Sequence, residues 1–141
     1  MNSPIPSLFR SVPDKDYLHL FNKNNVVQGD KVVELLNYKK TDVAAATNIS
    51  INSIRYEEER IPLELKERLT EWAIALNFVA SFFKDADKTI IWFATPNPLL
   101  GNMSPRDMIR IGRFKKLLNF IQTALNENAR DLPEPTKTRT Q

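Results

Sequence analysis

Residues 62–84 constrain the fold more than any other stretch of the chain. Large apolar side chains recur there at alternating steps of four and three residues: Leu65, Leu69, Trp72, Leu76, Val79 and Phe83. This spacing is that of one face of an α-helix, and Pro62 suits the first turn, where a missing N–H costs nothing. Ten of the twelve residues from Trp72 to Phe83 are hydrophobic, so this half needs cover on several sides. We therefore expect a long helix that is either the central core helix or part of a dimer interface.

The remaining pattern is also helical almost throughout, which predicts an all-α fold. Residues 85–93 contain a run that would suit a strand, but a strand among helices has nothing to pair with, so we expect a helix there. Residues 95–101 should be non-helical, because each of their two prolines forces its predecessor out of the α region. The predicted helices are 30–37, a helix capped by Thr41 and ending near Asn48, 51–56 capped by Ser50, 62–84, 85–93, one opened by Ser104 and Pro105, and 113–126.

The composition excludes several kinds of site. The 141 residues include no cysteine and one histidine, His19, so disulfides, thiolate metal sites and histidine-based catalysis are not expected. Three scattered glycines do not form a phosphate-binding loop, and no apolar run is long enough to span a membrane. An enzyme would also need paired carboxylates or a nucleophile–base spacing. We expect a cytoplasmic binding protein that is not an enzyme and uses no metal and no cofactor.

Positive charge gathers at the C-terminal end. The chain carries a net charge of +3, and residues 101–141 alone hold eight basic and four acidic residues, which gives +4. A positive end favours an acidic partner surface or a phosphate backbone.

Residues 40–57 have the local pattern of a helix-turn-helix. A short alanine-rich helix is followed by a turn at Asn48, which tolerates a left-handed backbone, and then by a second short helix. Side chains on its outer face could pair with bases and phosphates. The residues that we expect to contact DNA are Lys39, Lys40, Ser50, Asn52, Ser53, Arg55 and Tyr56. Two interpretations stay open, DNA binding and packing alone. Two short helices can serve packing alone, and the acidic run 57–59 would repel phosphates.

The most specific stretch is Trp92–Gly101 followed by Ser104–Ile109. It resembles the toxin-binding domain of the MbcA/ParS/Xre-type antitoxins, in which an aromatic helix end leads into a Pro-Asn-Pro-x-Leu-Gly turn and a proline-initiated helix. The resemblance extends over about residues 29–127, with departures at Asn48 and Asn102, where the family often has glycine. The matching positions are Trp92, Pro96, Asn97, Pro98, Leu100, Gly101, Pro105 and Ile109, then 114–125.

This resemblance implies an antitoxin of a type II toxin–antitoxin system. Its partner would be a RES-domain toxin, an enzyme that depletes NAD, and the C-terminal part of the antitoxin would cover the cleft of that enzyme. The chain would be a homodimer and would repress its own operon by binding operator DNA. The implied division is a partly disordered arm (1–28), a helix-turn-helix region (29–61), a linking helix (62–84), a toxin-binding module (85–129) and a flexible tail (130–141).

The expected toxin contacts combine the rigid apolar turn with nearby basic side chains. A turn held by two prolines and a glycine has little entropy left to lose on docking. The candidate residues are Trp92, Phe93, Asn97, Pro98, Leu99, Leu100, Gly101, Arg106, Arg110, Arg113 and Arg130. Trp92 and Leu100 could instead fill the core beneath the turn, and the basic residues could simply be solvated.

A second function is compatible with the same sequence. A helix-turn-helix regulator without a toxin partner would contain the same elements, and it would bind its operator tightly by itself. Its binding would depend steeply on salt, because phosphate contacts release counterions.

Overall fold

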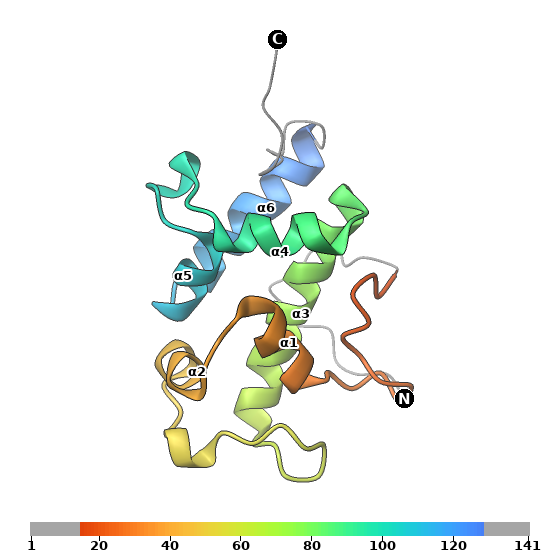
Figure 1. Ribbon diagram of the computed structural model, residues 1–141, viewed down its shortest axis with the longest axis vertical. Helices are drawn as coiled ribbons and strands as arrows, with labels where there is room; N and C mark the ends of the chain where they lie inside the picture. Colours follow the sequence, from red (N-terminus) through yellow and green to blue (C-terminus); the bar gives the residue numbers. More distant parts are fainter. Residues whose placement is uncertain (1–14, 129–141) are drawn as a thin grey trace.

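A computed structural model describes residues 15–128, with the side chains of residues 15–124 (Figure 1). The described residues contain α-helices, two single 3-10 turns and no β-strand, which confirms the predicted all-α fold. Residues 1–14 of the predicted arm (1–28) and the whole of the predicted flexible tail (130–141) lie outside this range. The elements are α1 (Gly29–Leu36), α2 (Lys40–Thr47), η1 (Ile51–Ser53), α3 (Leu63–Phe83), α4 (Ala86–Ala94), η2 (Pro98–Leu100), α5 (Pro105–Arg110) and α6 (Phe114–Asn128).

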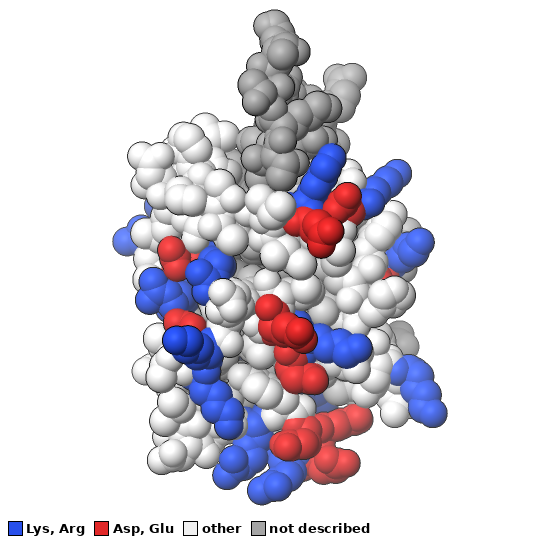
Figure 2. Space-filling view, viewed as in Figure 1, with Lys and Arg blue, Asp and Glu red and all other residues white. Residues whose placement is uncertain are grey.

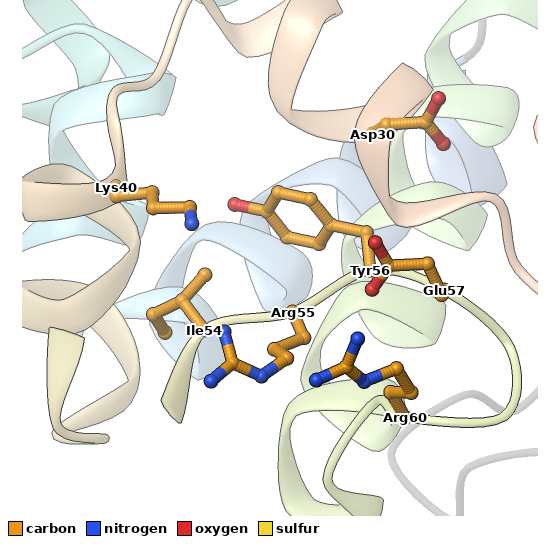
Figure 3. Close-up of a pocket in the computed structure, with 7 residues that line it drawn as sticks. All are labelled: Asp30, Lys40, Ile54, Arg55, Tyr56, Glu57 and Arg60. Atoms are coloured by element: carbon orange, nitrogen blue, oxygen red, sulfur yellow. The ribbon is translucent and has the colours of Figure 1, made fainter. Parts of the chain in front are cut away.

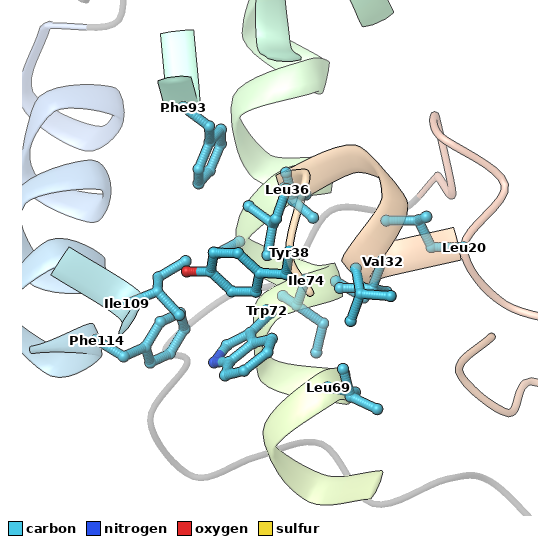
Figure 4. Packing of buried hydrophobic residues seen from close by; sticks show 14 of the residues in the cluster. Leu20, Val32, Leu36, Tyr38, Leu69, Trp72, Ile74, Phe93, Ile109 and Phe114 are labelled. Carbon is cyan, nitrogen blue, oxygen red and sulfur yellow. The ribbon is translucent and has the colours of Figure 1, made fainter. Parts of the chain in front are cut away.

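Helix α3 is the central helix of the core. It contacts α1, α4 and α6, and α5 joins α2, α4 and α6 (Figure 1). Of the predicted stripe, Leu65 through Val79 are buried, whereas Phe83 is partly exposed. Trp72 lies under Tyr38 with the two rings edge to face, 5.8 Å apart (Figure 4). The chain itself therefore covers most of the nearly all-apolar half of α3, and Phe78, Phe82 and Phe83 remain partly exposed.

Side-chain caps mark the starts of α4 and α5. The Asp85 side chain accepts a hydrogen bond from the Lys88 amide (3.0 Å) at the start of α4. The Ser104 hydroxyl accepts one from the Asp107 amide (3.2 Å), and Pro105 occupies the first turn of α5 as predicted. Asn48 ends α2 with φ 60°, the left-handed conformation expected for it.

Two predicted features of the region 40–57 are wrong. Helix α2 begins at Lys40 rather than after Thr41, because the Asp42 carboxylate accepts a hydrogen bond from the Lys39 amide (2.8 Å) and caps the helix earlier. The helix expected over 51–56 is only the 3-10 turn η1, and the chain is extended at Ile54. The β-branched and short polar residues of this segment are weak helix formers.

The turn at 95–101 is less irregular than expected. Both prolines keep the segment out of the α-helix, but Pro98–Leu100 form the single 3-10 turn η2. The segment thus has a fixed shape.

Residues 15–28 pack against α3. The Asp16 carboxylate accepts hydrogen bonds from the amides of Leu20 (2.8 Å) and Phe21 (2.9 Å) and from the side-chain amide of Asn77 (2.9 Å). Asn77 in turn accepts one from the Leu18 amide (3.0 Å). Leu20 is completely buried. This part of the predicted arm therefore belongs to the core.

The helices are too short or too polar to be membrane spans. Within residues 15–128 none combines the length and the apolar character that crossing a bilayer requires.

Candidate functional site

The loop between α4 and α5 is held in one shape by Asn97. Its side-chain oxygen accepts a hydrogen bond from the Leu99 amide (2.9 Å), and its carbonyl oxygen accepts two more, from the amides of Leu100 and Asn102 (both 2.9 Å). The Asn97 amide donates to the Met103 carbonyl (3.2 Å), which closes the loop. Gly101 follows η2 with φ 71°, a conformation that glycine adopts without strain. The buried asparagine is thus the structural centre of the loop.

The same loop presents an apolar surface. Leu99 is 69% exposed at the tip of η2, and Ile91 on α4 is 38% exposed. Pro98 and Gly101 are also exposed, and Leu100 is half-buried. Figure 2 shows an uncharged lobe at the upper left, where Figure 1 places η2 and the end of α4. We call this the η2 surface and define it by Ile91, Pro98, Leu99, Leu100 and Gly101.

Trp92 and Phe93 are core residues. Their exposed fractions are only 3% and 1%. The Trp92 ring meets Phe93 edge to face at 5.1 Å and lies nearly parallel to Phe120 at 6.5 Å. Of the two alternatives for Trp92, the core role holds, and the expectation that Phe93 is part of an exposed apolar anchor is wrong. The face of α4 that carries both residues turns toward α3 and α6. They support the loop from below.

Arg106 was expected to be an exposed partner contact, but it joins α5 to α1. Its guanidinium donates hydrogen bonds to the carbonyl oxygens of Leu36 (2.7 Å) and Asn37 (3.0 Å), at the end of α1. It also lies over the Tyr38 ring, 5.5 Å from its centre, and the Tyr38 hydroxyl donates to the Arg106 carbonyl. Burial raises the pKa of Tyr38. This arginine is therefore engaged within the fold.

The other basic candidates differ in exposure and in whether they pair with an acidic side chain. Arg110 forms an ion pair with Asp107 (3.3 Å) on the same helix, and Arg113 is exposed. Lys115 and Lys116 are exposed on α6. Arg130 lies outside the described residues.

Most of the predicted DNA contacts are exposed, but the helix expected over 51–56 to carry several of them is only the turn η1. Six of the seven side chains are exposed: Lys39, Lys40, Ser50, Asn52, Ser53 and Arg55. Tyr56 is half-buried and its hydroxyl is fully covered, so it does not face outward as expected. The acidic residues 57–59 are exposed in the loop that follows. The exposed side chains thus come from the start of α2, from η1 and its N-cap, and from the extended segment after η1.

Ile91 is the surface residue that sequence reasoning missed. A signal for it exists, since residues 89–105 form a run of seventeen positions without any charged side chain. A helix and loop without charge cannot have an ordinary solvated face. Helical spacing also places Ile91 away from Thr89, Trp92 and Phe93, which are buried.

Among the described residues, no group of three or more histidine, cysteine, aspartate or glutamate side chains could hold a metal ion.

Comparisons with known proteins find a fold but no family. No protein-family model matches the sequence, and no curated protein matches it. The chain is similar in fold to one chain of the crystal structure of the M. tuberculosis MbcT-MbcA toxin-antitoxin complex, with a TM-score of 0.50 and 23% sequence identity. The match covers 72% of this chain and 93% of that chain. At this identity the similarity establishes a shared fold.

Proposed function

We propose that this chain is an antitoxin that neutralises a partner toxin by direct contact. The observation that carries the proposal is the η2 surface, where a leucine is 69% exposed on a turn fixed by Asn97. The fold similarity to a chain of a toxin–antitoxin complex and the sequence resemblance to MbcA/ParS/Xre-type antitoxins support it independently.

The physical case for docking rests on shape and desolvation. Covering one leucine side chain contributes about 1.5–3 kcal/mol, and apolar anchors at the centre of an interface contribute most of the binding energy. The backbone hydrogen bonds around Asn97 already fix the loop, so little conformational entropy is lost on binding. The η2 surface thus has the properties of a preformed anchor.

We propose further that the toxin is of the RES type. This identity comes from the sequence resemblance, and the exposed cations Arg113, Lys115 and Lys116 would meet acidic groups around the cleft of such an enzyme.

The test is co-purification with the product of the neighbouring gene, followed by affinity measurement with Leu99→Asp. A buried carboxylate without a partner opposes binding, so we expect affinity to fall by at least about 30-fold, which corresponds to about 2 kcal/mol. Leu63→Asp is the matched control, because Leu63 is also 69% exposed and aspartate suits the first turn of α3. Equal affinities for the two variants would refute the assignment of the η2 surface.

Operator binding is the second part of the proposal, and a regulator without a toxin is the alternative function. The exposed lysines at the start of α2 and the exposed Asn52 on η1 support it. In a gel-shift assay with the DNA upstream of its own gene, Asn52→Ala should weaken binding by about 1–3 kcal/mol, because asparagine can pair with adenine through two hydrogen bonds. Toxin neutralisation should be unchanged. Specific shifts that Asn52→Ala does not affect would refute the role of η1.

A further inference from the structure

A pocket of about 360 Å³ lies beside η1, and Figure 3 shows its lining residues. It is formed by the start of α1, the start of α2 and the extended segment after η1. Its lining residues are Asp30, Lys40, Ile54, Arg55, Tyr56, Glu57 and Arg60. In the close-up, the guanidinium groups of Arg55 and Arg60 lie on one side of the pocket, and the ammonium group of Lys40 faces the Tyr56 hydroxyl.

The charged side chains of the pocket are unpaired. Lys40, Arg55 and Arg60 supply three positive charges against two negative ones from Asp30 and Glu57, so the lining carries +1. None of these five side chains makes a hydrogen bond or an ion pair with any residue in the described range. All five are exposed to solvent. An anion beside the two guanidinium groups would be attracted by both.

The Tyr56 hydroxyl is the buried polar group of the pocket. Its oxygen is covered from solvent and has no hydrogen-bond partner within residues 15–128. A buried hydroxyl without a partner destabilises the free protein. Burial and the nearby Asp30 raise the pKa of Tyr56, so the hydroxyl keeps its proton and remains a donor. It can donate one hydrogen bond to a bound group once the atoms that cover it move aside.

Gly29 makes room for this tyrosine. A Cβ atom at position 29 would lie 3.0 Å from Cδ1 of Tyr56 and 2.7 Å from Cδ1 of Leu69. The distance to Leu69 is shorter than real Cβ contacts and the distance to Tyr56 is tighter than most, so any other residue here would require these side chains to shift. The fold therefore brings the tyrosine close against the start of α1.

We propose that this pocket binds the phosphate group of a small phosphate monoester. Its oxygens would accept a hydrogen bond from Tyr56 and pair with the guanidinium groups of Arg55 and Arg60, whose planar forks suit phosphate. The volume is at the lower end of the range for small-molecule pockets, which leaves room for a small group attached to the phosphate. The proposal does not depend on the antitoxin function.

The test is a calorimetric titration of the full chain with adenosine monophosphate and, separately, with inorganic phosphate at low salt. Tyr56→Phe should weaken nucleotide binding by about tenfold or more and leave the melting temperature unchanged or raised, because it removes only the unpaired hydroxyl. Arg60→Gln should weaken binding at least as much. Asp30→Asn should strengthen it by removing a like charge. Tyr17→Phe and Arg113→Gln are the matched controls, and both should bind as the unmodified chain does.

Three results would overturn the proposal. The first is that neither phosphate probe binds. The second is that both bind, but with affinities that Tyr56→Phe and Arg60→Gln leave unchanged. The third is that Tyr56→Phe weakens only the binding of duplex DNA. The last result would assign the pocket to a nucleic-acid interface instead. Because toxin affinity is measured with Leu99→Asp on the η2 surface, failure of either proposal leaves the other standing.

Discussion

Arg106 shows at the scale of a single residue how a basic side chain can act inside the fold. The carbonyls at the end of a helix lack partners within the helix, and the Arg106 guanidinium supplies donors for those of Leu36 and Asn37. The contact spans seventy positions in sequence. No local pattern around residue 106 encodes it, so the sequence predicted a free, partner-facing arginine.

Arg106→Ala should therefore lower stability rather than weaken toxin binding directly. It removes two hydrogen bonds from a charged donor and the cation over the Tyr38 ring, so we expect a loss of about 2–3 kcal/mol in the free energy of unfolding. Urea denaturation measures this. Arg113→Ala, at an exposed position, should change stability by less than about 0.5 kcal/mol. Equal effects of the two substitutions would contradict the bridging role of Arg106.

At the scale of the element, the sequence predicted what local signals determine. The stripe over 62–84, the caps at Ser104 and Pro105 and the left-handed Asn48 all act within a few residues, and the structure confirms them. The prediction of a helix over 51–56 was wrong because the conformation of this segment depends on distant packing. Ile54 is completely buried and its backbone is extended. Propensity alone could not choose between a second helix and a single turn.

In the binding surfaces too, features set by local sequence could be predicted and features set by distant packing could not. The turn around Asn97 could be read from its two prolines and its glycine, and the exposure of Leu99 from its position between them. The orientations of Trp92 and Tyr56 could not be predicted from the sequence, because each depends on which neighbouring helix covers the ring. Aromatic residues in a motif are equally consistent with a core role and a contact role until that packing is known.

At the scale of the whole molecule, Asn77 connects the N-terminal segment to the central helix. It is 3% exposed, donates to Asp16 and accepts from Leu18. The sequence analysis predicted an arm here because the residue that anchors the segment, Asn77, lies about sixty positions away, on the apolar half of α3. The segment 15–28 thus extends the core beyond the region that the motifs marked.

Asn77→Ala should release residues 15–28 while α3 stays intact. The change breaks two buried hydrogen bonds, one of them to a carboxylate, at a cost of about 2–3 kcal/mol. The gain in helix propensity offsets at most about 0.7 kcal/mol. Hydrogen exchange should then quicken at the amides of Leu18, Leu20 and Phe21 and remain slow within α3. Asn119→Ala, on an exposed face of α6, is the control. If the three amides stay as protected as in the unmodified chain, Asn77 does not anchor this segment.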